Sequence, residues 1–399
     1  MCSAGWSGWR LCVPLGFLKL IYSSVLWGVV ACLEYEKVPA PPEEYVRVDH
    51  RELRRFVADV FERLGVPRGD AEIVADVLVT ADLRGIESHG VARLRRYVDG
   101  LKAGTVNPRP EIKAVRESRC TALLDGDRGL GQVVGCRAME LAIRKAESDM
   151  VGVVGVRNSN HYGIAGYYAL MAVERKLIGL SLTNSRPLAC HTGALGRTIG
   201  TNPIALGAPA KTPPPFLLDM ATTIVPIGKF ETYRRKGLEA PADWAIDSRG
   251  EVTRDPEVVL KEGALLPLGG LLEVTGGHKG YGLSVAVDIL CGLLTGAAWG
   301  SQVGGTAGPK PSNVGHFFAA LNVEAFMPLS EFLERVDELK RYLKSARKHP
   351  NFKEIWVHGE RSWLTMQTRL RKGVPVHKKT VEYFKEVSGE LGVKLPRGI

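Results

Sequence analysis

The stretch VGVVGVRNSNHYGIAGYY, residues 151–168, decides the fold of this 399-residue chain. Its first six residues are apolar and rich in valine, which predicts a buried strand over residues 151–156. A helix is predicted over residues 164–176 and a second strand over residues 178–183. Polar side chains at the end of a buried strand are favoured positions for ligand contacts, so Asn160 and His161 are the first candidate site residues.

Outward from this stretch, the chain begins with helices. Apolar residues at helical spacing predict helices over residues 51–64, from Pro67 onward, and roughly over residues 90–102. Short strands are predicted at 120–124, 203–209, 216–220, 317–323 and 354–357, and further helices at 281–295 (apolar and buried), 329–346 and 376–391. The order predicts a mixed α/β (α+β) class with a helical N-terminal region, because a Rossmann domain would open with a strand.

A glycine motif at residues 129–135, GLGQVVG, imitates a dinucleotide fingerprint, since it follows a predicted strand and opens a helix. Its spacing is GxGxxxG, one residue longer than the GxGxxG of the usual phosphate-binding turn. No second strand ending in an acidic residue follows at the required distance. We interpret the motif as a loop at the start of a helix and not as a Rossmann site.

Composition excludes several classes of protein. The chain has 53 Lys and Arg against 43 Asp and Glu, a net charge of +10, and 45% hydrophobic residues. These values exclude a disordered chain, a collagen-like fibre and a small disulfide scaffold. A nucleic-acid partner is not expected, because the basic residues are not clustered with interleaved aromatics. Charge spread in this way is usually a solvated surface, and an enzyme with anionic ligands is the more specific alternative.

The cysteines point to a reducing compartment. All seven are scattered without CxxC pairs or metal-ligand spacing, so neither a structural zinc site nor a disulfide framework is predicted. We therefore predict a cytoplasmic protein without a metal.

The N-terminal run LCVPLGFLKLIYSSVLWGVVACL, residues 11–33, is long enough to meet a bilayer. Lys19 interrupts it, and only Arg10 precedes it as a basic residue. Three interpretations stay open: a membrane anchor, a cleaved signal, or sequence upstream of the true start, which we favour. We predict that residues 1–45 form a hydrophobic extension and linker outside the working protein, and that no membrane is needed for activity.

A second polar motif, SHGVARLRRY, occupies residues 88–97, where one predicted helix stops and another begins. Ser88 stands at a position that can cap the new helix. Arg93 and Tyr97 are i,i+4 neighbours, with His89 one turn earlier, so these three side chains share one stripe. A guanidinium beside an imidazole and a phenol can hold a carboxylate and move a proton.

Other polar turns follow the later strands. Ser185 and Arg186 close one strand, and Asp219, Met220 and Ala221 end another. Each turn alone is a weak signal, since turns favour such residues. The motif GGHKGYG at 276–282 is more suggestive, because a glycine-rich helix N-terminus with an adjacent lysine is a ready anion site.

Taken in order, these motifs resemble the malate/L-lactate dehydrogenase family of NAD(P)-dependent oxidoreductases, which is unrelated to the Rossmann-fold lactate and malate dehydrogenases. The matching motifs are SHGxxRxxxY (88–97), NSNHYGIAGYY (158–168), TN (201–202), DMAT (219–222), LLPLGG (265–270) and GGHKGYGL (276–283). The resemblance covers roughly residues 47–395. It implies a non-Rossmann fold with a mixed or largely antiparallel sheet, NAD or NADP as cofactor, and a homodimer or larger homo-oligomer.

The resemblance also implies a domain plan and residue roles. Residues 46–125 would form the helical part of a substrate and dimer domain, 126–300 the NAD(P)-binding domain, and 301–399 a C-terminal part packing back on the first. His161 is similar to the family's proton donor and acceptor, and Ser88, His89 and Asp219 form a rival relay, so the choice between the two histidines stays open. The implied substrate contacts are His89, Arg93, Tyr97 and Lys279, and the implied cofactor contacts are Asn160, Ser185, Asp219, Met220, Ala221 and His278.

The implied reaction transfers hydride between a nicotinamide and a 2-hydroxy or 2-oxo carboxylate, with malate and oxaloacetate favoured. L-Sulfolactate, L-lactate and ureidoglycolate share the same core and stay open as substrates. Arg186 and Arg197 are candidates for contacting the 2′-phosphate of NADP, with plain surface roles as the alternative.

Overall fold

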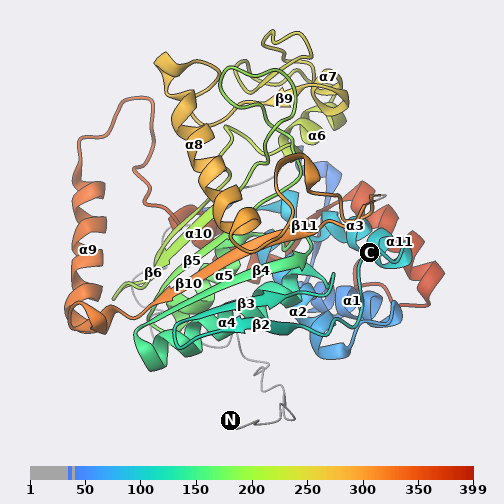
Figure 1. Cartoon of the computed structure of the whole chain (residues 1–399). Helices are drawn as coiled ribbons and strands as arrows, with labels where there is room; N and C mark the ends of the chain where they lie inside the picture. The colour runs from blue at the N-terminus through green and yellow to red at the C-terminus, as the bar shows by residue number, and fades with distance from the viewer. Residues whose placement is uncertain (1–34, 38–40, 309) are drawn as a thin grey trace. The chain divides into compact units, whose positions relative to one another are not determined.

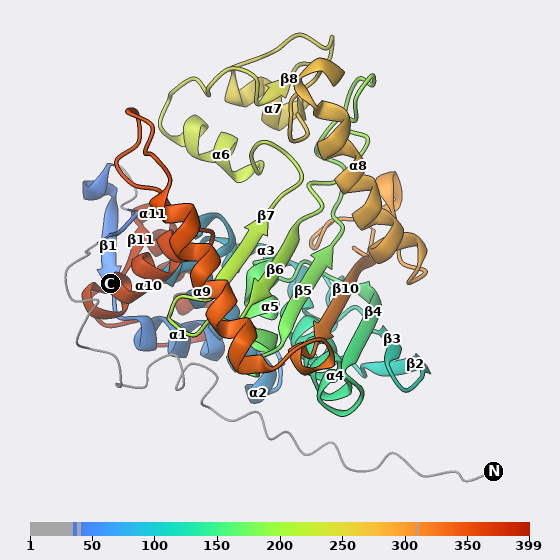
Figure 2. The same ribbon diagram turned by 90° about the vertical axis from the view of Figure 1, so that its left-hand side faces the viewer.

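The strand predicted at residues 151–156 is the beginning of β4 (Val151–Ser159) in the computed structural model. It belongs to a seven-stranded sheet with the order β2-β3-β4-β10-β5-β6-β7, which can be followed in Figure 2. Within this sheet β3 and β4 are parallel and the other neighbouring strands are antiparallel. The mixed, mainly antiparallel sheet confirms the predicted α/β (α+β) class. The other strands are β2 (Lys113–Glu117), β3 (Thr121–Asp125), β5 (Ile178–Thr183), β6 (Ile204–Ala208), β7 (Phe216–Met220) and β10 (Val314–Leu321).

Two helices, α4 (Gly131–Asp149) and α5 (Ala165–Glu174), lie against the sheet with very close backbone contact. A Cβ atom on Gly152 of β4 would lie 1.9 Å from the carbonyl oxygen of Ala142 in α4. A Cβ atom on Gly179 of β5 would lie 2.4 Å from the carbonyl oxygen of Ala169 in α5. Glycine is therefore required at both positions, because a larger residue would push the helix away from the strand.

From His50 onward the chain is helical, as predicted, with α1 (His50–Arg63), α2 (Arg68–Leu83) and α3 (Leu94–Lys102). The helix predicted over residues 90–102 begins later than expected. Two short 3₁₀ turns, η2 (Glu87–His89) and η3 (Val91–Arg93), precede α3. The Asp82 carboxylate accepts a hydrogen bond from the Val91 N–H (2.8 Å), which folds this segment tightly against α2. Ser88 consequently caps no helix, and its hydroxyl bonds to His89 instead.

The C-terminal part returns to the beginning of the described chain. Strand β1 (Tyr45–Val48) pairs antiparallel with β11 (Val374–His377), and helices α9 (Leu329–Ser345), α10 (Glu360–Lys372) and α11 (Lys378–Leu391) complete this part. The strand predicted at residues 354–357 is wrong. The Val357 N–H bonds to the Glu360 carboxylate (3.1 Å) and so belongs to the turn that opens α10, not to a sheet.

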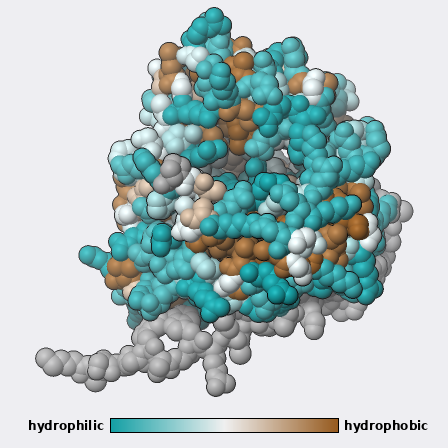
Figure 3. All heavy atoms as spheres, turned by 90° about the vertical axis from the view of Figure 1, so that its right-hand side faces the viewer, coloured by the Kyte–Doolittle hydropathy of each residue, from teal (hydrophilic) through white to brown (hydrophobic). Residues whose placement is uncertain are grey.

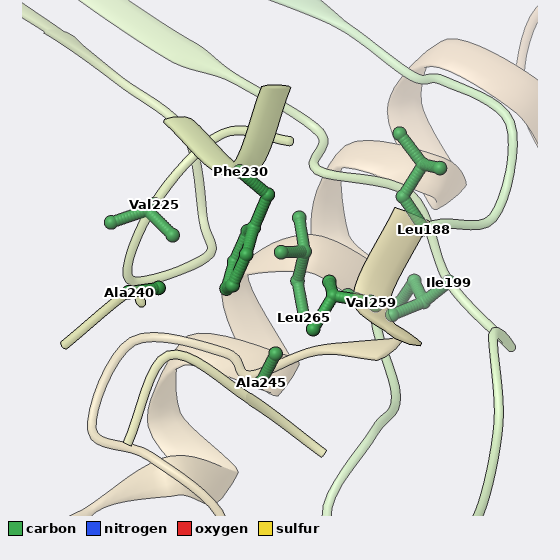
Figure 4. Close-up of a cluster of buried hydrophobic side chains, with 9 residues drawn as sticks. Leu188, Ile199, Val225, Phe230, Ala240, Ala245, Val259 and Leu265 are labelled. Atoms are coloured by element: carbon green, nitrogen blue, oxygen red, sulfur yellow. The ribbon is translucent and has the colours of Figure 1, made fainter. Parts of the chain in front are cut away.

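A smaller apolar core lies in the part of the molecule that holds α6 (Gly228–Arg235), α7 (Pro256–Lys261), β8 (Ala245–Ile246) and β9 (Ala264–Leu265). Figure 4 shows its side chains converging around Phe230 and Leu265. Its buried members are Leu188, Ile199, Val225, Phe230, Ala240, Ala245, Val259 and Leu265, with Ala189. Helix α8 (Gly277–Asp288) runs from this part down to the sheet, as Figure 1 shows.

The apolar helix predicted at residues 281–295 differs from expectation in bounds and burial. Helix α8 begins at Gly277, and a π-helical turn, η5 (Ile289–Leu293), replaces its last part. Val287 and Cys291 are buried, but Leu283 and Ile289 are 43% and 47% exposed. Only one side of the helix therefore faces the core. The remaining short turns are η1 (Pro42–Glu44), η4 (Glu273–Thr275), η6 (Gly300–Gln302) and η7 (Val323–Ala325).

The structure describes residues 35–37, 41–308 and 310–399, and Tyr35–Ile399 forms one compact unit. The apolar run at residues 11–33 lies outside the described residues, and no described helix is long and apolar enough to cross a membrane. Glu36 forms ion pairs with Arg47 (2.9 Å) and Arg369 (3.2 Å), so the described part of the expected linker contacts the folded body. The domain boundaries at residues 45, 125 and 300 stay predictions.

Candidate active site

His161 lies directly after β4 and is the centre of the candidate site. The Asn160 side chain fixes this turn by donating hydrogen bonds to the carbonyl oxygens of Arg128 (2.9 Å) and Gly129 (3.0 Å). His161 Nδ1 lies 2.6 Å from the Tyr97 hydroxyl and accepts a longer bond from the Gly163 N–H (3.3 Å). No residue in the described part of the chain bonds to its Nε2. One ring nitrogen is therefore held by the protein and the other is available to a ligand.

The two polar motifs, distant in sequence, meet at this histidine. The His89 ring stacks on the His161 ring, with centroids 5.6 Å apart and planes inclined by 21°. The Ser88 hydroxyl is 2.9 Å from His89 Nδ1, and Arg93 Nε donates a hydrogen bond to the Ser88 carbonyl oxygen (2.6 Å). The structure thus brings together Ser88, His89, Arg93, Tyr97 and His161, all of them candidate residues from the sequence.

Burial controls the charges at this cluster. It lowers the pKa of His89 to about 3 and the pKa of His161 well below the usual range, and Arg93 and Arg96 act in the same direction. Burial also raises the pKa of Tyr97 to about 12, although the same two arginines oppose this rise. At neutral pH the free site therefore holds neutral rings beside two cations, which suits an anionic ligand.

Arg96 belongs to this cluster although the sequence analysis did not select it. It is largely buried, its Nε donates a hydrogen bond to Thr306 Oγ1 (2.8 Å), and burial lowers its pKa to about 10. The motif contains three arginines, Arg93, Arg95 and Arg96. Arg93 and Arg96 are partly buried and Arg95 is exposed, and a sequence predicts this difference only if the start of the helix is known. Helix α3 begins at Leu94, four residues later than predicted, which explains why this phase could not be predicted from the sequence.

Arg93 links the site to the smaller part of the molecule. Its side chain is 22% exposed, and its Nη2 lies 3.3 Å from the Glu231 carboxylate of α6. Because a partly exposed ion pair of this length is weak, a substrate carboxylate can replace Glu231 as the partner of Arg93.

Asp219 occupies a different position from the histidine cluster. It ends β7, and its Oδ2 accepts a hydrogen bond from the Gly166 N–H (2.9 Å) at the start of α5. Burial raises its pKa, whereas the Gly166 N–H and the Arg84 charge lower it. Neither histidine bonds to this carboxylate in the described structure. The Ser88–His89 half of the rival relay is assembled, and the link from His89 to Asp219 stays a prediction.

Asp219 also lines a cavity of about 340 Å³, together with Arg84, His358 and Arg361. Met220 and Ala221, which follow Asp219, are partly exposed. The walls of this cavity combine one carboxylate with two guanidinium groups, so they can contact both polar and anionic parts of a ligand.

The predicted cofactor residues around Ser185 form a connected loop cluster. The Ser185 hydroxyl accepts a hydrogen bond from the Thr201 N–H (3.0 Å), and Asn202 joins the Ser185 backbone to α8 through the Ser284 carbonyl oxygen. His278 and Lys279 are exposed in the first turn of α8. This turn lies against the 265–270 motif so closely that a Cβ atom on Gly280 would be 2.3 Å from the Leu268 carbonyl oxygen.

The two arginines considered for a 2′-phosphate differ in the structure. Arg197 donates hydrogen bonds to the carbonyl oxygens of Gly263 (2.8 Å) and Val259 (2.8 Å), so its guanidinium is engaged at the end of α7. Arg186 is exposed beside the Ser185 loop.

No group of three or more described His, Cys, Asp or Glu residues could hold a metal ion.

His316 supports the site from behind and was missed by the sequence analysis. It is fully buried in β10, where its ring nitrogens lie 2.7 Å from Thr183 Oγ1 and 2.8 Å from Ser159 Oγ. Its ring stacks on Tyr162 at a centroid distance of 4.6 Å. The sequence feature that could have indicated His316 is a single histidine at the start of an apolar predicted strand.

We expect His316 to make folding stability depend on pH. Burial lowers the pKa of His316 in the folded state to about 3. Below about pH 6.5 the unfolded chain therefore binds a proton at this residue that the folded chain does not bind. The free energy of unfolding should therefore fall below pH 6.5, by about 1.4 kcal/mol per pH unit from this residue. Urea unfolding of the wild type and His316→Gln between pH 7 and 5 measures the difference in slope. Equal slopes would contradict the assignment.

The sheet and the site together indicate a class of enzyme. A partly exposed histidine held by a tyrosine beside two arginines, in a mainly antiparallel sheet, is suited to proton transfer on an anionic substrate. The chain belongs to the malate/L-lactate dehydrogenase family, whose model matches residues 48–385. It is an oxidoreductase of the malate dehydrogenase type.

Individual relatives agree with this family. The chain is 58% identical over 352 residues to the malate dehydrogenase of Pyrococcus abyssi, covering 88% of this chain and 97% of that protein. It is 42% identical over 343 residues to the L-sulfolactate dehydrogenase of Methanocaldococcus jannaschii, covering 86% and 96%. The solved structure of the Pyrococcus horikoshii malate dehydrogenase matches with a TM-score of 0.84 and 54% identity, covering 90% and 99%.

Proposed function

We propose that this protein interconverts malate and oxaloacetate with NAD or NADP, with His161 as the acid and base. The observation that carries this proposal is the His161 ring, which is bonded to Tyr97 through Nδ1 and has a free Nε2 beside Arg93 and Arg96. The 58% identity to the malate dehydrogenase of Pyrococcus abyssi supports malate as the substrate.

The residues divide the chemical work as follows. Arg93 binds the substrate carboxylate next to the reacting carbon, and this carboxylate replaces Glu231 as the partner of Arg93. The charge of Arg96 favours a second anionic group on the substrate. His161 removes the hydroxyl proton during oxidation and returns a proton to the carbonyl oxygen during reduction. A bound nicotinamide supplies the hydride chemistry. His89 stacks on His161 and keeps the ring plane fixed, and Lys279 contacts the substrate from α8.

We assign the cofactor to the loop cluster around Ser185 and to the residues that line the Asp219 cavity. The exposed first turn of α8, with its glycine backbone and His278, has the donors that a pyrophosphate requires. The cofactor contacts in this proposal are Asn160, Ser185, Asp219, Met220, Ala221 and His278. Arg186 is the candidate for contacting a 2′-phosphate, since the Arg197 guanidinium already bonds to α7.

L-Sulfolactate is the second candidate substrate, because the 42% identical relative from Methanocaldococcus jannaschii carries that name. A sulfonate and a carboxylate are both anionic, so the same pair of arginines can bind either. L-Lactate lacks the second anionic group and would leave the Arg96 charge without a partner, and ureidoglycolate replaces that group with a neutral one.

We also propose a cytoplasmic homodimer. The four described cysteines, Cys120, Cys136, Cys190 and Cys291, are free thiols, which fits a reducing compartment. Large apolar side chains are exposed along α8 and the turn after it, at Leu283, Ile289, Leu293 and Leu294. Figure 3 shows another face, where hydrophobic residues gather in patches within a mainly hydrophilic surface. Apolar patches of this kind are typical of subunit contacts.

A spectrophotometric panel tests the proposal. Absorbance at 340 nm, a wavelength set by the reduced nicotinamide, is followed with NADH and NADPH against oxaloacetate, sulfopyruvate, pyruvate and a glyoxylate-type substrate. We expect the highest kcat/KM with oxaloacetate, and at least tenfold less with pyruvate, because one charge-assisted contact is lost. Absence of turnover with all four substrates would refute the proposed function.

A further inference from the structure

Helix α4 begins directly against the catalytic histidine. A Cβ atom on Gly131, its first residue, would lie 2.1 Å from the Asn160 carbonyl oxygen and 2.6 Å from the His161 carbonyl oxygen. Gly131 belongs to the GLGQ segment that resembles a dinucleotide fingerprint in the sequence. In the structure its glycine serves a different purpose, because it lets the helix approach the His161 backbone and places the next side chain, Gln132, behind the site.

Gln132 is fully buried, and neither nitrogen nor oxygen of its carboxamide has a hydrogen-bond partner in the described part of the chain. Desolvating an amide without giving it partners is unfavourable, so such groups require an explanation. The Gln132 carboxamide is near enough to the Tyr97 hydroxyl to lower the pKa of Tyr97, and this hydroxyl lies 2.6 Å from His161 Nδ1. Gln132 and Tyr97 are both 0% exposed, whereas His161 is partly exposed, so a substrate can reach His161 but not Gln132.

We propose that Gln132 is a positioning residue that lets Tyr97 exchange donor and acceptor roles with His161 during turnover. In the resting state the Tyr97 hydroxyl donates to His161 Nδ1, which also accepts from the Gly163 N–H, and the Gln132 carboxamide is left without a partner. To act as a base, His161 needs a free lone pair on Nε2. The ring reaches this tautomer when Nε2 releases its proton to solvent and Nδ1 takes up a proton from solvent, so that the Nδ1–H donates to the Tyr97 oxygen. The Tyr97 hydroxyl then turns and donates to the Gln132 oxygen.

The chemistry of a carboxamide fits this exchange. It is the side-chain group that offers a donor and an acceptor at one end without carrying charge, so it can follow either orientation of the tyrosine hydroxyl. Which ring nitrogen of a histidine carries the proton is set by the bond that the other nitrogen makes. Gln132 thereby acts on Nε2 through two intervening groups, Tyr97 and the imidazole, without touching the substrate.

The test uses three variants of the full chain, assayed with the hydroxy acid and cofactor that give the highest turnover. Gln132→Met keeps the shape and removes both polar atoms, so the Tyr97 hydroxyl loses its acceptor. We expect kcat for oxidation to fall about 10²-fold with KM changed less than threefold, because proton transfer is impaired and binding is not. Gln132→Glu keeps an acceptor oxygen and should be at least about tenfold more active than Gln132→Met.

Two controls separate positioning from a general effect on folding. The melting temperature of Gln132→Met should equal or exceed that of the wild type, because an unpartnered buried amide is removed. Thr80→Val removes another buried and unpartnered polar atom, on α2, and should leave kcat unchanged. A loss of kcat together with a large fall in melting temperature, without rescue by Gln132→Glu, would count against the proposal.

A double-mutant cycle gives the sharpest result. If Gln132 acts through Tyr97, adding Gln132→Met to Tyr97→Phe should lower kcat by less than twofold, since the hydroxyl that it orients is already absent. Effects that multiply would contradict the inference. The inference rests on the proposed role of His161, and the two can fail separately. An inactive wild type refutes the proposed function, whereas an active wild type with an unaffected Gln132→Met variant refutes the role of Gln132 alone.

Discussion

Replacing His161 by asparagine should lower kcat about 10³-fold in both directions of the reaction, while KM for the hydroxy acid changes little. Asparagine has a similar size and polarity but does not accept a proton at neutral pH, and general acid–base catalysis contributes about 10²- to 10⁴-fold. The His161 ring is held by Tyr97 through Nδ1, and no described residue bonds to its Nε2, which we propose contacts the substrate. Steady-state kinetics with the preferred substrate and cofactor measure this loss.

His89→Asn is the matched control for His161→Asn. His89 stacks on His161, but its Nδ1 is occupied by the Ser88 hydroxyl and the described structure shows no bond from it to Asp219. We expect a loss of about tenfold, from a less well-fixed His161 ring. If His89→Asn abolished turnover and His161→Asn kept it, the proton would travel through the Ser88–His89–Asp219 relay instead.

The acid side of the pH profile gives a second check on His161. Burial and the charges of Arg93 and Arg96 hold the pKa of His161 well below its usual range in the free enzyme. The ring therefore stays neutral, and competent as a base, to lower pH than an exposed histidine would. The kcat/KM for oxidation should accordingly begin to fall at a pH below 6.5. A midpoint above pH 7 would indicate a different base.

Local sequence patterns predict much of this fold, because its helices and strands follow apolar periodicity. The strands at 151–156 and 178–183 were recognisable because both are apolar, and their glycines match the close approach of α4 and α5. The segment at 354–357 has the same apolar appearance, yet it forms a turn, since a carboxylate three residues onward captures its N–H. Short segments are decided by such single contacts, which periodicity does not contain.

The candidate site was partly visible in the sequence. Its basic, imidazole and phenol side chains stand out in the polar motifs at 88–97 and 158–168. The stacking of His89 on His161 depends on how η2 and η3 fold against α2, which only the tertiary structure shows. Gln132 and His316 were missed because each is a single polar residue in an apolar helix or strand. The signal they share is a buried polar group in a place where an apolar one would suffice.

The mainly antiparallel sheet also explains why the fingerprint-like motif at 129–135 has no dinucleotide role in our proposal. In a Rossmann domain the glycine turn follows the first strand and the pyrophosphate sits on the helix N-terminus. Here the first turn of α4 lies against the carbonyl oxygens of Asn160 and His161, so the protein backbone already fills that space. In our proposal the anion site lies instead at the first turn of α8, where His278 and Lys279 are exposed.

Replacing Arg93 by alanine should raise KM for the hydroxy acid about 100-fold, with KM for the cofactor nearly unchanged. A charge-assisted pair between arginine and carboxylate in a partly buried site contributes about 1.5–3 kcal/mol, and a factor of ten corresponds to about 1.4 kcal/mol. Arg93→Lys keeps the charge but not the two-pronged geometry, so we expect about a tenfold increase. Initial rates at varied substrate, with the cofactor saturating, measure both values.

Two neighbouring residues make the Arg93 result specific. Arg95 lies in the same motif but is exposed and paired with Glu386 (2.8 Å), so Arg95→Ala should change KM less than twofold. Glu231 lies 3.3 Å from Arg93 in a weak, partly exposed ion pair, and in our proposal the substrate carboxylate displaces it. Glu231→Gln should therefore lower KM two- to threefold, because the substrate no longer displaces a carboxylate. A higher KM in Glu231→Gln would mean that Glu231 orients Arg93 for the substrate. Equal increases of KM in Arg95→Ala and Arg93→Ala would mean that Arg93 attracts the substrate only through its general charge and does not bind the carboxylate directly.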